Sequence, residues 1–352
     1  MNYNAQKFDK NEYELQSLGS ETKKEALLAP VAPKQTTSLA TYSLIIFIAI
    51  GVKVIQPLTI ANAKNEDGSY RFNESTMVLL VEIVKLIFCT CVFAIQYKNT
   101  EDDSKSELHN LPFKMSLHFL VPALLYAASN TLVYYGISYI NPGLFHVFGN
   151  IRILIAGILY RFMMGKKQSD LQWLSLILIA CGAVLSSPAP EHANSSDNYL
   201  MGLLLLSLMS VCSTSASIYT EKYFKKTQKL SIFYQNIILY LYGILVNTFV
   251  VVFLKSEEKG AFDGFDQSGF MVLAAQSAMG VSLSFIFKYL DNIVYVISLT
   301  VAMLITAVIS MMFFDLDPTY EFFSSMAVIT IGIYIFYRSK LFEKFGIQDL
   351  VY

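Results

Sequence analysis

The sequence has little charge and few of the residue groupings that soluble enzymes use. Only 15% of its 352 residues are charged, against about 25% in a soluble domain, while 54% are hydrophobic. No nucleophile with its base, metal-ligand cluster or phosphate-binding loop appears, and nothing indicates a nucleic-acid partner. The composition therefore excludes a soluble protein and predicts a membrane protein that is not an enzyme and uses no metal or cofactor.

Cysteines are also few, and their positions exclude a disulfide framework. All four lie within apolar runs and lack the spacing of a disulfide or metal site, so we interpret them as small packing residues. They are Cys89, Cys91, Cys181 and Cys212. A cleavable signal peptide is not expected either, because the first 38 residues are polar and rich in Lys and Glu.

What the chain does have is a long series of apolar runs, each near the length of about 20 residues that crosses a bilayer. They predict an all-α membrane protein with ten transmembrane helices over residues 39–338, between a disordered cytosolic tail (1–38) and a cytosolic C-terminal tail (339–352). The ten runs are Leu39–Ala63, Thr76–Tyr97, Met115–Ile140, Leu144–Met164, Leu171–Ser187, Leu200–Thr220, Ile232–Leu254, Phe270–Tyr289, Ile293–Phe314 and Phe322–Tyr337.

The distribution of Lys and Arg predicts the orientation of these spans. With the N-terminus in the cytosol, 19 of the 26 basic residues fall in cytosolic tails and loops and only 4 on the other side. This asymmetry follows the positive-inside rule and supports the count of ten, since one missed span would disrupt it. Two Asn-x-Ser sequons, at Asn73 and Asn194, fall on the non-cytosolic side and are glycosylation candidates.

Four charged residues lie well inside the runs: Lys53, Glu82, Lys85 and Arg152. A charge inside a bilayer costs about 2.5–3.5 kcal/mol on insertion scales, so such residues need a partner, water or a ligand. Glu82 and Lys85 are three residues apart and can form an ion pair on one helix face, which could be purely structural. Lys53 and Arg152 leave a positive excess that would suit an anionic ligand.

Polar side chains gather in the third and seventh runs. Asn130 lies in the third, and Asn236, Tyr240 and Tyr242 lie in the seventh, with Asn236 and Tyr240 four residues apart on one helix face. Such amides and phenols either pair between helices or bind a ligand, and a base with its ribose would use both kinds of group. Both interpretations stay open for each residue taken singly.

Several motifs make the chain resemble the nucleotide-sugar transporters of the drug/metabolite transporter superfamily, in the branch with the CMP-sialic acid and UDP-sugar carriers. The matching stretches are Val81–Leu86, Tyr126–Asn130, Phe145–Ile153, Tyr219–Lys222, Gln235–Tyr240 and Lys288–Ile293. Three positions depart from the sialic-acid carriers, where Tyr stands at Gly149 and Lys at Arg152 and Tyr295. The chain is therefore closer to the divergent CMP-sialic acid transporter-like proteins, whose substrates include UDP-sugars.

This resemblance implies ten helices in an inverted 5+5 repeat around a central cavity, the drug/metabolite transporter fold. The sequence carries only a faint repeat, Met163–Met164 before Gly182 and Met311–Met312 before Gly332. The resemblance also implies a multi-pass protein in the lipid bilayer of the Golgi or endoplasmic reticulum that exchanges a cytosolic nucleotide sugar for lumenal nucleoside monophosphate and uses no cofactor. A homodimer is a further expectation.

The substrate-binding residues implied by the resemblance and by the buried polar groups form one set. They are Glu82, Lys85, Asn130, Arg152, Asn236, Tyr240, Tyr242, Lys288 and Tyr295. Two other functions stay open at this point: an exporter of another anionic metabolite within the same superfamily, and a membrane scaffold that transports nothing. The charges inside the spans count against the scaffold, which gains nothing from them.

Overall fold

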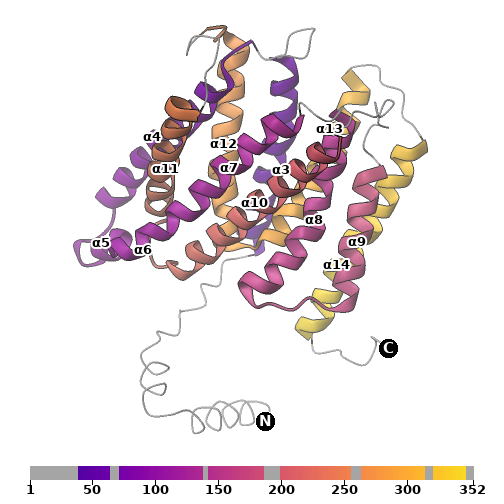
Figure 1. Cartoon of the computed structure of the whole chain (residues 1–352). Helices are drawn as coiled ribbons and strands as arrows, with labels where there is room; N and C mark the ends of the chain where they lie inside the picture. Colours follow the sequence, from indigo (N-terminus) through magenta and orange to yellow (C-terminus); the bar gives the residue numbers. More distant parts are fainter. Residues whose placement is uncertain are drawn as a thin grey trace, which may run out of the picture. The chain divides into compact units, whose positions relative to one another are not determined.

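A computed structural model describes residues 39–63, 71–137, 142–185, 199–254, 263–313 and 320–345 of the chain. Over these residues the protein is helical and contains no β-strand. The long helices, shown in Figure 1, are α3 (Leu39–Asn62), α4 (Glu74–Lys98), α7 (Leu120–Ile137), α8 (Pro142–Met164), α9 (Asp170–Leu185), α10 (Tyr199–Lys226), α11 (Ile232–Phe249), α12 (Gln267–Tyr289), α13 (Asn292–Phe313) and α14 (Tyr320–Phe345).

Six of these helices are long and apolar enough to cross a membrane: α3, α4, α10, α11 with its continuation, α12 and α14. Two shorter apolar stretches, Asp170–Leu185 and Asn292–Thr306, lie in α9 and α13. The expectation of a multi-pass helical membrane protein is therefore confirmed. Within the described residues, each of the ten expected apolar runs lies mainly on one of the long helices, and the number of ten membrane crossings stays a prediction.

The structure differs from the expected runs at several helix ends. The largest difference is in α14, which continues eight residues past Tyr337, to Phe345, within the expected C-terminal tail. The third run begins with the short helices α6 (Phe113–Ser116) and η1 (Leu117–Phe119) before α7, and the seventh ends in the π-helix η2 (Val250–Leu254). Helix α10 continues six residues past the expected end at Thr220, to Lys226. A short α-helix, α5 (Asp102–His109), stands between the second and third runs, where a loop was expected.

The long helices pack in pairs that are distant in the sequence. Helix α9 lies along α14, α7 along α10, α4 along α11 and α3 along α12, while α8 contacts both α10 and α9, and α13 contacts α3 (Figure 1). Aromatic side chains such as Phe119, Phe224, Phe287 and Phe336 fill the main core between them. The first four of these pairs each join a helix of the first five to a helix of the last five, so the two halves of the chain interlock.

Helices α9 and α14 approach each other closely at two glycines. A Cβ at Gly182 would lie 2.6 Å from Ile329 Cγ1, and a Cβ at Gly332 would lie 2.8 Å from Ile179 Cγ1. Gly182 therefore makes room for Ile329 of α14, and Gly332 makes room for Ile179 of α9. Each isoleucine lies three residues before the glycine of its own helix. The contact is reciprocal, as it is across a two-fold axis.

The non-cytosolic end predicted from the charges is tied together by Asp266, the N-cap of α12. Its Oδ1 accepts hydrogen bonds from the Gly269 backbone N–H at 3.0 Å and from Ser268 Oγ, and its Oδ2 forms an ion pair with Arg71 Nη1 at 3.1 Å. These bonds favour the ionised carboxylate, chiefly through Ser268, and lower the pKa of Asp266 to about 2. Arg71 lies just before α4, so this cap also links α12 to the start of α4.

We expect Gly182→Ala to destabilise the protein by about 1–3 kcal/mol, because its methyl group would overlap Ile329 in a close-packed contact. The matched control is Gly51→Ala in α3, where a Cβ would meet nothing within 4 Å and alanine is the better helix former. Thermal unfolding of the two purified variants in the same detergent measures the difference. Equal melting temperatures would contradict this close contact.

We expect acid to weaken the α12 cap between about pH 4 and pH 2. A carboxylate whose pKa falls from 3.8 to about 2 on folding stabilises the native state fully above pH 4, and that contribution is lost as the pH falls through the folded value. Unfolding of wild type and Asp266→Asn should be compared at pH 7, 4, 3 and 2. Their difference in stability should shrink over the lowest steps; a difference independent of pH would contradict the cap.

Candidate substrate-binding site

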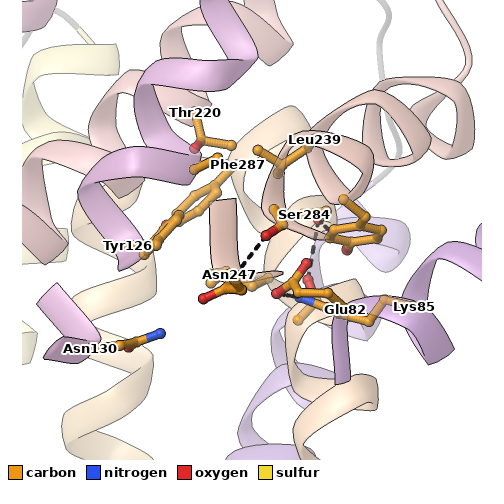
Figure 2. A pocket seen from close by; sticks show the side chains of 14 residues that line it. Glu82, Lys85, Tyr126, Asn130, Thr220, Leu239, Asn247, Ser284 and Phe287 are labelled. Carbon is orange, nitrogen blue, oxygen red and sulfur yellow. Dashed lines mark hydrogen bonds and ion pairs between the residues drawn. The ribbon is translucent and has the colours of Figure 1, made fainter. Parts of the chain in front are cut away.

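A cavity of about 190 Å³ opens among five helices. Its polar lining gathers at two places that Figure 2 shows on opposite sides of the space, with Glu82 and Lys85 on one side and Tyr126 and Asn130 on the other. The helices are α4, α7, α10, α11 and α12, and the lining residues are Glu82, Lys85, Ala123, Tyr126, Asn130, Thr220, Leu239, Tyr240, Gly243, Asn247, Gly280, Leu283, Ser284 and Phe287.

The ion pair expected between Glu82 and Lys85 forms in this lining. Lys85 Nζ lies 2.5 Å from Glu82 Oε1, and the two side chains are 9% and 18% exposed. The same ammonium lies 4.4 Å from the centre of the Tyr240 ring, within the range of a cation–π contact. The pair is therefore neutralised internally, yet it faces a space that a ligand could enter.

Two glycines on neighbouring helices make room for this ion pair. A Cβ at Gly243 of α11 would lie 2.9 Å from Glu82 Oε2, and a Cβ at Gly280 of α12 would lie 2.6 Å from Lys85 Cδ. Any larger residue at either position would displace the charged side chains. The positions of the two charged groups of α4 therefore depend on a glycine in α11 and a glycine in α12.

Aromatic and amide groups complete the cavity. The Tyr240 hydroxyl and Ser284 Oγ are 3.4 Å apart, and Asn247 Nδ2 donates a hydrogen bond to the Gly243 carbonyl at 2.8 Å. Asn130 lies opposite and is exposed, and its side chain forms no hydrogen bond within the described part of the chain. This combination offers ring faces for a base and amides for its polar edge.

Arg152 lines a second, smaller cavity of about 30 Å³. Tyr126 belongs to both linings, so it stands between the two spaces. Tyr295 also lines the smaller cavity, with its ring edge-on to Phe287 at 5.6 Å between centroids. The remaining lining residues are Ser213, Thr214, Ser217, Leu283, Asn292 and Val296.

The polar groups of this smaller cavity are poorly satisfied. Within the part of the chain that the structure describes, Arg152 Nε, Thr214 Oγ1 and both amide atoms of Asn292 are buried without a hydrogen-bond partner. Arg152 Nη2 reaches only the Met209 thioether, at 3.9 Å, and Arg152 has no carboxylate within 4 Å among the described residues. Buried donors of this kind are normally paired, so the cavity has unmet capacity for an acceptor-rich ligand.

Three other residues expected at the site lie elsewhere. Asn236 is fully buried beside the Cys89 thiol and lines neither cavity. The Tyr242 hydroxyl lies 3.3 Å from Ser116 Oγ, two residues along α11 from Tyr240 and on another face of that helix. Lys288, which the charge count assigned to a cytosolic loop, is buried and donates to the Leu230 carbonyl.

The structure describes one of the two sequons, the one at Asn73. Asn73 is buried and caps α4, accepting a hydrogen bond from the Thr76 backbone N–H at 2.9 Å. Its side chain therefore has a structural role, and glycosylation there stays a prediction. Asn194 lies outside the described residues.

The sequence did not reveal the buried carboxylate of Glu221, because α10 was expected to end one residue earlier. Glu221 accepts a hydrogen bond from the Tyr160 hydroxyl at 2.9 Å and from the Asn292 backbone N–H at 2.8 Å, and forms an ion pair with Lys225. It thereby joins α8, α10 and the start of α13 beside the smaller cavity. The basic run after Glu221 had suggested a solvated loop, and only the added helical turn brings the carboxylate inside.

Comparison with known proteins identifies relatives over most of the chain. A family model described as "Nucleotide-sugar transporter" matches residues 35–337. CMP-sialic acid transporter 2 of Oryza sativa subsp. indica is 28% identical over 91% of this chain and 90% of its own length. CMP-sialic acid transporter 4 of Arabidopsis thaliana is 30% identical over 78% of each chain, and the probable UDP-sugar transporter protein SLC35A4 of Xenopus tropicalis is 30% identical over 78% of this chain and 85% of its own.

A solved structure shares the fold. It is 12% identical in sequence, with a TM-score of 0.62 over 85% of this chain and 96% of its own, and at that identity it supports the helix arrangement alone.

We expect Glu82→Gln and Lys85→Met each to destabilise the protein by about 3 kcal/mol, because each leaves the other charge buried and unpaired. The double variant should recover most of that stability, since it removes both charges. Thermal unfolding in detergent of wild type, both single variants and the double variant measures this coupling. Additive losses in the double variant would contradict the pairing.

Proposed function

The chain belongs to the nucleotide-sugar transporter family, and we propose that it is an antiporter that exchanges a cytosolic CMP- or UDP-sugar for lumenal nucleoside monophosphate. The observation that carries the proposal is the pair of adjoining cavities that share Tyr126. One has the rings and amides that suit a nucleoside. The other has an arginine that lacks a carboxylate partner among the described residues and suits a phosphate or a sugar carboxylate.

The proposed contacts follow from this arrangement. Tyr240 and Tyr126 offer ring faces to the base, while Asn130 and Asn247 offer amide groups to its edge or to the ribose. Arg152 would form charge-assisted hydrogen bonds with the anionic group beyond Tyr126. Tyr295 would contact the same group, whereas Asn236, Tyr242 and Lys288 would support the helices from outside the cavities.

The helix pairing supports alternating access through an inverted 5+5 repeat. Numbering the ten long helices in order, the close pairs are one with eight, two with seven, three with six and five with ten. If each helix is replaced by its counterpart in the other half (one by six, two by seven, and so on), the pair of one with eight becomes the pair of six with three. The pairs of two with seven and of five with ten stay the same. The reciprocal contact of Gly182 and Gly332 follows the same relation, because Ile179 and Ile329 each lie three residues before the glycine of their own helix.

The proposed location is the Golgi membrane or the endoplasmic reticulum, with ten spans and both termini in the cytosol. The family supports an internal membrane, and the excess of Lys and Arg in the expected cytosolic loops supports the orientation. The relatives named for CMP-sialic acid and for UDP-sugar both match this chain, so the base and the sugar are the variables for experiment.

Exchange in proteoliposomes tests the function. Separate batches of the reconstituted protein are preloaded with CMP, UMP, GMP or AMP, and uptake of labelled CMP and UMP is followed. We expect one internal monophosphate to stimulate uptake several-fold and so identify the base. Equal and unstimulated leakage from all four batches would overturn the proposal.

Arg152→Leu should reduce this exchange to the level of protein-free liposomes while the protein still folds. The control is Arg161→Leu on the same helix, where the side chain is exposed, and its exchange should match wild type. Normal exchange by Arg152→Leu would exclude Arg152 as the anion contact.

A further inference from the structure

We propose that the smaller cavity binds a small inorganic anion, such as chloride, when no nucleotide occupies the protein. Arg152, Thr214 and Asn292, which all line this cavity, would hold the ion. The ion is a counter-ion for Arg152 that the anionic group of a nucleotide displaces. The anion site follows from the cavity alone, whereas its competition with a nucleotide rests on the proposed exchange.

The size of the cavity limits what it can hold. Its volume is about 30 Å³, whereas one ordered water needs about 10–15 Å³ by the same measure. The space therefore takes one monatomic ion or about two water molecules. A phosphate group is larger, and it enters only if the helices around Arg152 move apart.

Arg152 has no counter-ion in the described part of the chain. No carboxylate lies within 4 Å of it, its Nη2 reaches only the Met209 sulfur at 3.9 Å, and its Nε is buried without a partner. A guanidinium stays charged at any pH that the protein meets, and an uncompensated charge inside a helix bundle is costly. An anion in the adjoining cavity supplies the missing compensation.

The carboxylate beside this cavity is already engaged. Glu221 accepts hydrogen bonds from the Tyr160 hydroxyl and from the Asn292 backbone N–H, and it forms an ion pair with Lys225. It therefore contacts the backbone of Asn292 and leaves the side chain unbound. The lining of the cavity, as far as the structure describes it, contains no Asp or Glu that would repel an anion.

Two fully buried polar side chains add neutral donors to this charge. Thr214 of α10 is 1% exposed and Asn292 at the start of α13 is 0% exposed, and neither side chain has a hydrogen-bond partner among the described residues. The hydroxyl can donate one hydrogen bond and the amide two, so with the Arg152 N–H groups they suit a ligand that only accepts. Because both ends of the Asn292 amide are unbound, it can turn its nitrogen toward the ion.

An anion fits these groups better than water alone does. Water would satisfy the hydroxyl and the amide, but it brings no negative charge to Arg152. Chloride still falls short of a nucleotide, because it donates no hydrogen bond to Asn292 Oδ1 and leaves the larger cavity unfilled. The ion therefore reduces the cost of an empty site without removing it, and a nucleotide can displace it.

Thermal unfolding in detergent tests the anion site without any nucleotide. Chloride in place of the bulkier gluconate, at constant ionic strength, should raise the melting temperature of wild type by about 2 °C or more, in a saturable way. Arg152→Leu and Asn292→Leu should lose this rise. Asn292→Leu should fold, because it replaces a buried amide without partners by an apolar side chain of similar size.

The matched control is Arg161→Leu, which removes an exposed arginine of the same helix and should keep the full rise. An equal rise in wild type and Arg152→Leu would indicate a general effect of chloride and would overturn the anion site. The absence of a saturable rise in wild type, or its full retention in Asn292→Leu, would overturn it as well.

Exchange in proteoliposomes tests the competition. External chloride in place of gluconate should raise the half-saturating concentration of the exchanged monophosphate by about twofold or more, with the maximal rate unchanged. A half-saturating concentration that does not depend on chloride would overturn the displacement of the ion by a nucleotide. A wild-type protein that responds to chloride in thermal unfolding but exchanges no nucleotide would instead overturn the proposed function and leave the anion site in place.

Discussion

The need to compensate charge within a membrane-embedded helix bundle organises this molecule. Glu82 and Lys85 satisfy each other one turn apart, and Glu221 is held by Lys225, a tyrosine hydroxyl and the start of α13. Arg152 and Lys53 have no such compensation in the described part of the chain. Leaving a cation unpaired in a bundle is costly, so Arg152, which lines the smaller cavity, marks a place where a ligand's negative charge would be stabilising.

Small residues decide where these charges can stand. Gly243 and Gly280 leave the volume that Glu82 and Lys85 occupy, and each would crowd the pair if it carried even one more carbon. Glycines also bring α9 and α14 together, where small residues let helix backbones approach in the absence of a hydrophobic driving force between apolar helices. The same residue type therefore opens a cavity between some helices and closes the space between others.

Much of the helical framework could be predicted from the sequence, because apolar runs and basic loops follow directly from the solvent properties of a bilayer. The Glu82–Lys85 pair could also be predicted, since residues three apart on a helix share a face. Periodicity within one helix does not say which neighbour that face will meet. For this reason Asn236, one turn before Tyr240, was expected in the cavity but lies beside Cys89.

Contacts between distant parts of the chain could not be predicted from the sequence for the same reason. Glu221 became internal only through an added turn of α10, and Asp266 joins α12 to Arg71 across nearly two hundred residues. Neither contact leaves a local pattern, because each depends on how whole helices pack. Local sequence patterns therefore predict the helices, whereas the residues that line the site depend on how those helices pack together.

The two cavities differ in how well their polar groups are satisfied, and this difference offers a physical reason for the proposed exchange. In the larger cavity the charged pair is complete without a ligand, so emptying it leaves few groups unpaired. In the smaller one Arg152 and Asn292 keep unmet hydrogen-bonding capacity, and an empty transporter must carry that cost through its conformational change. A returning monophosphate would satisfy these groups on the reverse path, which lowers the barrier for a loaded carrier relative to an empty one. Obligate exchange, in place of one-way release, would follow from where the buried donors lie.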